Sequence, residues 1–371
     1  SLDGDLTKKE LLSAEGADVD SLVTIGRRQR VIGASYATEK RMVKYFDTSF
    51  HDLANALSNA LPGKPVVSFV GASEDERELL LITGSDVDPG MLYKFDRDTN
   101  RLNPLLPIRE MTEGRTLANM TPVTFPASDG TQIPGYLTLP LGSDGKNLPA
   151  IVMPHGGPSA RDEWGFDWLV QFFAARGYAV LQPNFRGSTG YGAEWFGKNG
   201  VKAWRTAIGD VNDAGRWLVS QGIANEGKTA IVGWSYGGYA ALQSQVVDAD
   251  LYKAVVAIAP VTDWGQLLDE ERNSFGYRLV QKFIGEGPHI EQGSPMRNVG
   301  AFHSPVLLFH GTADNNVDVE QSREMEKALH KAGKNVEYIE FDGLAHALHD
   351  GAARKEMLVK IDSFLASTLG S

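Results

Sequence analysis

A serine between a short apolar run and a helix-forming segment constrains the fold of this chain more than any other feature. Residues 229–232 have the length and apolar character of a central parallel strand, and residues 239–247 contain no proline and favour a helix. Between them lies Gly233-Trp234-Ser235-Tyr236-Gly237, a Gly-x-Ser-x-Gly pattern. In such an elbow the glycines leave room for neighbouring backbone, and the serine is exposed as a nucleophile. The alternative is that Gly237 and Gly238 only allow close packing of the helix.

Further apolar runs predict the architecture around this elbow. They alternate with helical patterns, and this alternation predicts the α/β class, with a mostly parallel sheet covered on both faces. One helical pattern, over residues 203–221, has a single apolar stripe that we interpret as core rather than as a binding face. The predicted strands lie near residues 149–153, 178–183, 229–234, 253–259, 305–310 and 335–341, and the stripe consists of Trp204, Ile208, Val211, Ala214 and Leu218.

Asp314 is the best candidate for the acid that a serine nucleophile needs. The serine requires a base, the base requires an acid, and in this architecture the chain order is serine, acid, histidine. A strand-like run at residues 305–309 is followed by His310-Gly311-Thr312-Ala313-Asp314, which puts Asp314 at the sheet edge where such folds build their sites. Asp318 has another interpretation, because Asp318-Val319-Glu320-Gln321 resembles a helix capping box.

His346 is the predicted base. It lies on a loop after the strand-like residues 336–341, at the same sheet edge as Asp314. His349 starts the final helical pattern and remains the alternative base, whereas His310 ends its strand and is interpreted as structural. The histidines that follow Ser235 are His289, His303, His310, His330, His346 and His349.

A second loop predicts the donors that would stabilise an oxyanion. The strand-like residues 148–153 are followed by His155-Gly156-Gly157-Pro158, which has the position of the early loop that supplies one backbone donor. We predict the amides of Tyr236 and Gly157 as the donor pair, with the side chain of His155 near the hole. The alternative is a plain Gly-Pro turn.

Together these segments resemble the catalytic domain of the prolyl oligopeptidase family of serine peptidases. The resemblance covers residues from about 120 to 369 and is greatest for acylaminoacyl-peptidase-like and dipeptidyl-peptidase-like members. It is carried by His155-Gly156-Gly157-Pro158, residues 183–192, the elbow with Tyr236 and Tyr239, residues 260–264 and residues 310–314.

The resemblance implies an α/β-hydrolase fold with Ser235, Asp314 and His346 as the triad. It also implies cleavage of peptide or acyl-peptide substrates through an acyl-serine intermediate. Asn316 lies where members use Asn or Arg to hold a substrate carbonyl. The residues Trp264, Phe275 and Tyr277, with Leu279 and Phe283, lie where the family builds its first specificity pocket, although core packing explains these aromatic side chains equally well.

Two rival functions use the same residues. A carboxylesterase acting on non-peptide esters would have the same triad, because the fold hosts both chemistries. A catalytically silent binding protein is the other rival, and the intact triad argues against it.

The first 115 residues differ in sequence pattern from residues 116–371. We therefore predict that they form a separate domain. Short strand-like runs and one helix, near residues 51–61, resemble about two blades of a β-propeller. A closed propeller usually needs four to eight blades. We therefore expect the open strand edges to pair with a separate N-terminal fragment of the same polypeptide, in preference to a fold-back arrangement or a second copy.

Composition excludes several other classes of function. The chain has 371 residues, 42% of them hydrophobic, and its net charge of −11 argues against nucleic-acid binding. It contains no cysteine, no apolar stretch long enough to span a membrane, and no metal-ligand or cofactor motif. We therefore predict a soluble protein without metal or cofactor, in a cytoplasmic or periplasmic compartment that the sequence does not distinguish.

Overall fold

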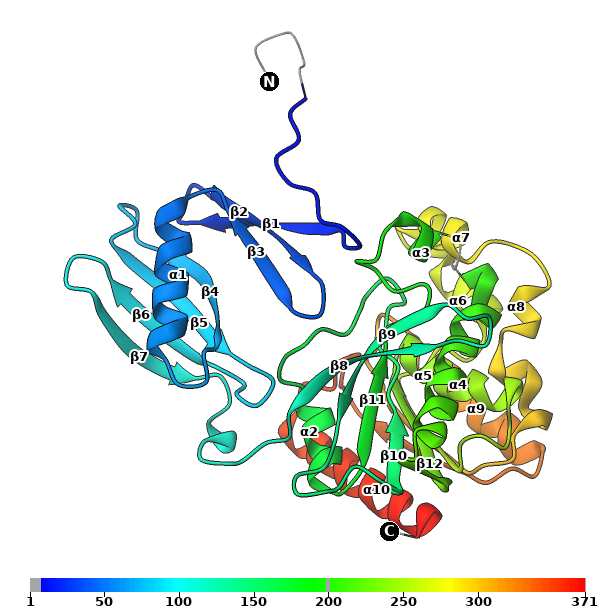
Figure 1. The fold of residues 1–371 in the computed structure, drawn as a ribbon. Coiled ribbons are helices and arrows are strands. Elements are labelled where there is room, and N and C mark those ends of the chain that lie inside the picture. Colours follow the sequence, from blue (N-terminus) through cyan, green and yellow to red (C-terminus); the bar gives the residue numbers. More distant parts are fainter. Residues whose placement is uncertain (1–7, 198–200, 371) are drawn as a thin grey trace. The chain divides into compact units, whose positions relative to one another are not determined.

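The structure is a computed structural model that describes residues 8–197 and 201–370 (Figure 1). The chain divides into two compact units. The first comprises the chain up to Met120, with Glu163–Gln171 and Gly190–Gly192. The second comprises Thr121–Asp162, Phe172–Thr189 and the chain from Ala193 onward. The division into domains at residues 115 and 116 stays a prediction.

The first unit contains two small antiparallel sheets. One has the order β1-β2-β3 and the other the order β4-β5-β6-β7. Four antiparallel strands make up one propeller blade, so the second sheet matches a blade and the first has one strand fewer. The bounds are β1 Val19–Ile25, β2 Arg30–Ala37, β3 Arg41–Tyr45, α1 Thr48–Ala60, β4 Val66–Ala72, β5 Glu78–Gly84, β6 Met91–Asp96, β7 Arg101–Pro107 and a 3₁₀ turn at Glu110–Thr112.

Helix α1 joins these sheets through a small core. Asp47 caps the helix by accepting a hydrogen bond from the amide of Ser49 at 3.0 Å. On the buried face, the rings of Phe50 and Phe69 meet edge to face with centroids 5.0 Å apart. Their neighbours in this core are Ile25, Ile32, Leu57, Val67, Leu79, Leu81 and Phe95.

The second unit is built on an eight-stranded sheet with the order β15-β14-β13-β12-β10-β11-β9-β8. The six strands from β15 to β11 are parallel to their neighbours, which confirms the predicted mostly parallel sheet. Strand β9 is antiparallel to β11. The bounds are β8 Met120–Pro126, β9 Gln132–Thr138, β10 Leu148–Val152, β11 Ala179–Pro183, β12 Ala224–Trp234, β13 Ala254–Ile258, β14 Val306–Gly311 and β15 Val336–Phe341.

The strand order of this sheet reverses next to β10. The chain passes from β10 to β11 on one side and later returns to β12 on the other. Ligands of open parallel sheets bind at the carboxyl ends of the strands where the order reverses. The loop after β10 and the turn after β12 therefore meet at the position in the sheet that favours a site.

Helices cover both faces of the large sheet. Figure 1 shows α4, α5 and α9 on one face and α10 on the other. The predicted apolar stripe of α4 is fully buried, which confirms its interpretation as core. The bounds are α2 Trp168–Ala175, α3 Ala193–Gly197, α4 Trp204–Ser220, α5 Tyr236–Val247, α6 Trp264–Glu270, α7 Tyr277–Ile284, α8 His289–Gln292, α9 Glu320–Lys331 and α10 Gly351–Leu369, with 3₁₀ turns at Val201–Ala203, Glu271–Asn273 and Pro295–Ala301.

None of the helices in residues 8–197 and 201–370 has both the length and the apolar character needed to cross a lipid bilayer.

Candidate active site

Ser235 occupies the turn between β12 and α5 in a strained backbone conformation. Its φ is 59° and its ψ is −121°, a region that a residue with a Cβ rarely adopts and that costs about 1–3 kcal/mol. The amide of Ser235 donates to the carbonyl of Ile258 at 2.8 Å, and the amide of Tyr239 donates to the carbonyl of Ser235 at 2.9 Å. Sheet and helix thus hold the turn from both sides, and Ser235 lies on the strand-to-helix turn that the pattern predicted.

The two glycines of the pattern are explained by close backbone approach. A Cβ on Gly233 would lie 2.0 Å from the carbonyl oxygen of Gly237. A Cβ on Gly237 would lie 2.1 Å from the carbonyl oxygen of Pro154. Neither position has space for a side chain. Pro154 belongs to the loop after β10, so a glycine at position 237 allows that loop to approach the helix. The alternative, that the glycines only allow close packing of the helix, does not explain this contact with the loop.

The loop after β10 lies directly against the elbow. A Cβ on Gly156 would lie 3.2 Å from the carbonyl oxygen of Trp234 and 3.4 Å from the Cβ of Ser235. Gly157 has a φ of 118°, which only glycine adopts without strain. Within the described residues its amide donates no hydrogen bond, and the amide of Tyr236, the first residue of α5, has no partner in the helix. Two backbone donors therefore remain open beside Ser235.

His155 holds the Gly156 peptide and does not present a free N–H to the hole. Its Nδ1 donates to the carbonyl of Gly156 at 2.7 Å, and its Nε2 is paired with the hydroxyl of Ser188 at 2.7 Å. Burial, the main cause, lowers the pKa of His155 to about 4, although the bond to Gly156 opposes this shift. The expectation that the His155 side chain lies near the hole stays a prediction, and both of its ring nitrogens are occupied. In a planar trans peptide the carbonyl and the N–H point in opposite directions, so His155 orients the N–H of Gly157 indirectly.

Asp314 and His346 form a hydrogen-bonded pair. The Nδ1 of His346 donates to Oδ2 of Asp314 at 2.6 Å, while Oδ1 of Asp314 accepts the amides of Asn316 at 2.8 Å and Val317 at 3.1 Å. Burial raises the pKa of Asp314, but hydrogen bonds from His310, His346 and these amides outweigh it and hold the pKa below its usual range. Since Nδ1 of His346 carries the hydrogen, Nε2 of the neutral ring is left as a proton acceptor.

The elbow also holds the loop that carries His346. The indole Nε1 of Trp234 donates to the backbone carbonyl of His346 at 3.0 Å. Among the described residues, the hydroxyl of Ser235 makes no hydrogen bond, to His346 or to any other side chain. Contacts of this kind often tighten only when substrate binds. The structure thus brings together the loops of Ser235, His346 and Asp314.

Two residues that the sequence predicts at helix starts, His349 and Asp318, lie close to the starts of α10 and α9. His349 pairs with Arg354 at 3.3 Å, and α10 begins behind Asp350, whose carboxylate accepts the amide of Ala353 at 2.7 Å. Near the other helix start, Asp318 accepts the amide of Glu320 at 2.9 Å, as a capping residue would. The capping box is nevertheless wrong, because the side chain of Gln321 does not return to Asp318 and is buried elsewhere.

A cavity of about 410 Å³ opens beside Ser235. Trp264 and Asn316 line it, as predicted for substrate-binding residues. Phe275 and Tyr277 do not, since Phe275 is fully exposed and Tyr277 lies at the start of α7 outside the lining. The remaining lining residues are Gly157, Pro158, Tyr236, Val261, Leu267, Leu279, Val280, Phe283, Ile284 and Val317.

The sequence contained a signal for part of this lining. Leu279, Val280, Phe283 and Ile284 recur with the spacing of one helical face, and this face of α7 borders the cavity. Leu279 and Phe283 of this face are among the residues predicted from the sequence, together with Phe275 and Tyr277, which lie outside the lining. The helical period is the better guide, because the four apolar residues that share one face of α7 all line the cavity.

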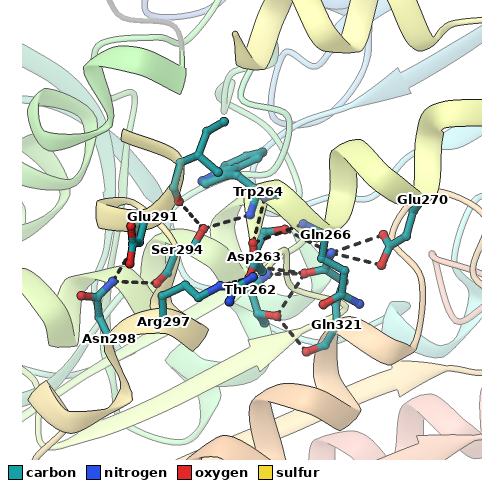
Figure 2. Close-up of polar contacts among 12 residues, drawn as sticks. Thr262, Asp263, Trp264, Gln266, Glu270, Glu291, Ser294, Arg297, Asn298 and Gln321 are labelled. Carbon is teal, nitrogen blue, oxygen red and sulfur yellow. Dashed lines mark hydrogen bonds and ion pairs between the residues drawn. The ribbon is translucent and has the colours of Figure 1, made fainter. Parts of the chain in front are cut away.

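A buried polar network fixes the cavity wall that carries Val261 and Trp264 (Figure 2). Oε1 of Gln321 accepts the amides of Thr262 and Asp263, both at 2.9 Å. The carboxylate of Asp263, which is 1% exposed, caps α6 through the amides of Gly265 and Gln266 and forms an ion pair with Arg297. On the other side, the hydroxyl of Ser294 accepts the amide of Trp264 at 3.0 Å. The wall is therefore set by hydrogen bonds as well as by packing.

In the part of the chain that the structure describes, no cluster of three or more His, Asp or Glu side chains has the arrangement needed to hold a metal ion. Beside Ser235 lie two open backbone donors and the loop that carries His346, which is hydrogen-bonded to Asp314.

Comparison with known proteins shows to which family this chain is similar. Residues 164–371, more than half of the chain, match the prolyl oligopeptidase family. Dipeptidyl aminopeptidase BIII of Pseudoxanthomonas mexicana is 30% identical over 313 residues, which cover 80% of this chain and 45% of that protein. Dipeptidyl peptidase family member 6 of Caenorhabditis elegans is 26% identical and matches 99% of this chain and 54% of its own length. This chain thus spans about half the length of the curated relatives it matches.

Solved structures extend the likeness to the fold. A puromycin-hydrolyzing peptidase of Mycobacterium tuberculosis superposes with a TM-score of 0.77 at 24% identity, over 91% of this chain and 52% of that one. The likeness confirms the predicted α/β-hydrolase fold, preceded by antiparallel sheets that match part of a propeller. On the family match and this fold, the chain belongs to the prolyl oligopeptidase family.

Proposed function

We propose that this chain is a serine peptidase that cleaves peptide or acyl-peptide substrates through an acyl-serine intermediate, with Ser235, His346 and Asp314 as its triad. One observation carries the proposal. Ser235 lies on a strained turn between two open backbone donors and the loop of His346, which is itself hydrogen-bonded to the elbow. Strain at a non-glycine residue persists where the surroundings over-determine it, and such positions cluster at active sites.

Acylation would follow from the positions of these groups. Nε2 of His346 takes the proton of the Ser235 hydroxyl as Oγ attacks the substrate carbonyl. The amides of Gly157 and Tyr236 donate hydrogen bonds to the carbonyl oxygen as negative charge develops on it, and each such donor is typically worth about 10²- to 10³-fold in rate. The carboxylate of Asp314 stabilises the imidazolium of His346 through the 2.6 Å bond at Nδ1.

Collapse of the tetrahedral intermediate would return the proton. The imidazolium of His346 gives the proton to the leaving amine, the C–N bond breaks, and the acyl group stays on Ser235. A water molecule then repeats the attack with His346 as its base, which releases the acid and restores the serine. Every proton moves through Nε2 of one ring, so no further titratable group is required.

The cavity supports a substrate with an apolar side chain next to the scissile bond. Its walls beside Ser235 are Val261, Trp264, Leu267 and Val317, and pockets of this apolar kind bind apolar side chains. Asn316 is exposed at the same cavity, where its amide can donate to a substrate carbonyl. This set favours an amino-acid residue over a simple acyl chain, because a peptide offers both a side chain and a carbonyl.

We also propose that the sheets of the first unit pair with further β-structure. The β1–β3 sheet has one strand fewer than a blade, and apolar residues on the strands stay exposed, among them Leu22, Val70, Leu105 and Leu106. Exposed apolar strands invite pairing with another chain. We propose a separate fragment of the same polypeptide as the partner, with a second copy of the chain as the rival.

A serine-reactive fluorophosphonate tests the nucleophile directly. We expect one label per chain on Ser235, none on Ser235→Ala, and normal labelling of the control Ser220→Ala, which changes an exposed serine on α4. Peptide mapping of the labelled protein identifies the site. Absence of labelling in the unmodified chain would sink the proposal and favour a silent binding protein.

A substrate panel then separates peptidase from esterase. Acyl-amino-acid and dipeptidyl p-nitroanilides should be cleaved with a higher kcat/KM, relative to their uncatalysed rates, than short-chain p-nitrophenyl esters. If only the esters turn over, the chain is a carboxylesterase with the same triad. Native mass spectrometry of the same preparation reports whether a fragment or a second copy accompanies the 40.3 kDa chain.

A further inference from the structure

The carboxylate of Asp314 contacts two histidines on the same oxygen. Nδ1 of His346 lies 2.6 Å from Oδ2, and Nε2 of His310 lies 3.2 Å from the same atom. His310 is the second-last residue of β14, and both its side chain and that of Asp314 are fully buried. The sequence predicts a structural histidine at this position, and a contact with the acid is an additional property.

The protonation of His310 follows from its neighbours. Nε2 faces two acceptors, the carbonyl of Val317 at 3.0 Å and Oδ2 of Asp314 at 3.2 Å. Neither can donate, so Nε2 carries a hydrogen in every protonation state of the ring. Nδ1 is paired with the hydroxyl of Ser322 on α9 at 2.8 Å, and this bond fixes the plane of the ring. The N–H of Nε2 is therefore hydrogen-bonded to Val317, and it lies beside Oδ2 of Asp314, toward which it carries partial positive charge.

Four groups surround the carboxylate of Asp314. Oδ1 accepts the amides of Asn316 and Val317, and Oδ2 accepts Nδ1–H of His346. Nε2 of His310, whose N–H is hydrogen-bonded to the carbonyl of Val317, lies 3.2 Å from the same Oδ2. If His310 were absent, Oδ2 would be held only by His346, the ring that moves a proton in the proposed reaction. A carboxylate held by that bond alone would follow the imidazole and would not orient it.

We propose that His310 is a positioning residue, whose Nε2–H fixes Oδ2 of Asp314 in the orientation that receives Nδ1–H of His346. The proposal rests on the proposed triad function. It differs from a role in core packing, because it requires a donor at Nε2 rather than a side chain of suitable volume.

Two amide variants separate these roles. The amide of Gln reaches the position of Nε2, so His310→Gln keeps a donor to Asp314 and loses the partner of Ser322. The shorter amide of Asn reaches the position of Nδ1, so His310→Asn keeps Ser322 and loses Asp314. We expect His310→Asn to lower kcat on the order of 10²-fold, as a small misplacement of a catalytic group does, with KM little changed. His310→Gln should recover most of this loss.

A milder variant tests the proposal if both His310→Gln and His310→Asn disturb folding. Ser322→Ala leaves His310 and its Nε2–H in place but frees the ring plane, and we expect a fall in kcat of about 3-fold. For every variant, circular dichroism and the midpoint of thermal unfolding report the fold. The downfield proton resonance of the bond between His346 and Asp314 should persist in His310→Gln and shift or broaden in His310→Asn.

The outcomes distinguish this inference from the proposed function. If the unmodified chain is not labelled by the fluorophosphonate, the triad itself fails. If it is labelled, and His310→Asn and His310→Gln have equal kcat and unchanged downfield resonances, the inference is overturned while the triad stands. A selective loss in His310→Asn with rescue in His310→Gln supports it.

Discussion

The indole Nε1 of Trp234 donates a 3.0 Å hydrogen bond to the backbone carbonyl of His346. Trp234 is the last residue of β12, directly before the candidate nucleophile. One side chain thus ties the end of a central strand to the loop of the candidate base. The distance between the hydroxyl of Ser235 and the ring of His346 therefore depends on a contact that neither of these two groups makes.

Removal of this contact should slow turnover without unfolding the chain. Trp234→Phe keeps the aromatic volume and removes the N–H, so we expect kcat to fall about 10-fold while KM stays similar. Trp217→Phe on α4 is the matched control. Steady-state kinetics on one p-nitroanilide checks the pair, and equal kcat values would show that the loop is held by other means.

The strain at Ser235 gives a prediction about stability. Ser235→Ala should lower activity by about 10⁴-fold or more and leave stability unchanged, since alanine has the same Cβ in the same conformation. Ser235→Gly should be equally inactive but more stable than Ser235→Ala by about 1 kcal/mol, because glycine relieves the positive φ. Urea unfolding of the two variants measures the difference. A less stable glycine variant would argue against strain at this turn.

The pKa of His155 predicts a loss of stability in acid. The folded pKa is lowered from 6.5 to about 4, so the unfolded chain binds the proton more readily. The contribution of neutral His155 to the free energy of unfolding is therefore complete above pH 6.5 and is lost as the pH falls from 6.5 to 4. Between pH 7 and pH 5 this loss is about 2 kcal/mol.

His155→Asn isolates this contribution, because asparagine does not titrate and its amide can still donate to Gly156. Between pH 7 and pH 5 the free energy of unfolding should fall in both proteins. The fall should be about 2 kcal/mol smaller in His155→Asn than in the unmodified chain. Parallel pH profiles of stability for the two proteins would contradict the assignment.

The cavity lining predicts selectivity for side-chain size. Leu267→Trp fills the cavity, so kcat/KM should fall about 10- to 200-fold for substrates with a large apolar residue and much less for alanine substrates. Phe275→Ala is the control, since Phe275 is exposed and outside the cavity, and it should change neither ratio. A fall in kcat/KM for Phe275→Ala would place that ring in the substrate path.

Central strands could be predicted from the sequence because burial on both faces leaves continuous apolar runs. Strands β12, β13 and β14 are such runs. Once these strands are predicted, the sheet edge that carries Ser235 and Asp314 can be predicted as well. Peripheral strands could not be predicted in this way. β8, β9 and β7 contain prolines within mostly polar or mixed segments, a composition that is tolerated at sheet edges and resembles loops.

Contacts between side chains that are far apart in the sequence also could not be predicted. Nothing in the pattern around Asp318 indicated that Gln321 turns inward to Thr262 and Asp263, since its spacing also fits a capping box. His310 and Asp314 were both singled out, but their contact depends on the turn between them. The sequence supplied the residue types, and the tertiary turns decided which of them meet.

Two consecutive residues in the first turn of α9 serve different parts of the site. Gln321 holds the amides of Thr262 and Asp263, next to the cavity wall, and Ser322 holds His310 against Asp314. One helical turn thus links what the cavity accepts with how the acid is held. A displacement of α9 would alter substrate range and turnover together, so an engineered loop exchange meant to change the cavity alone has to carry this turn with it.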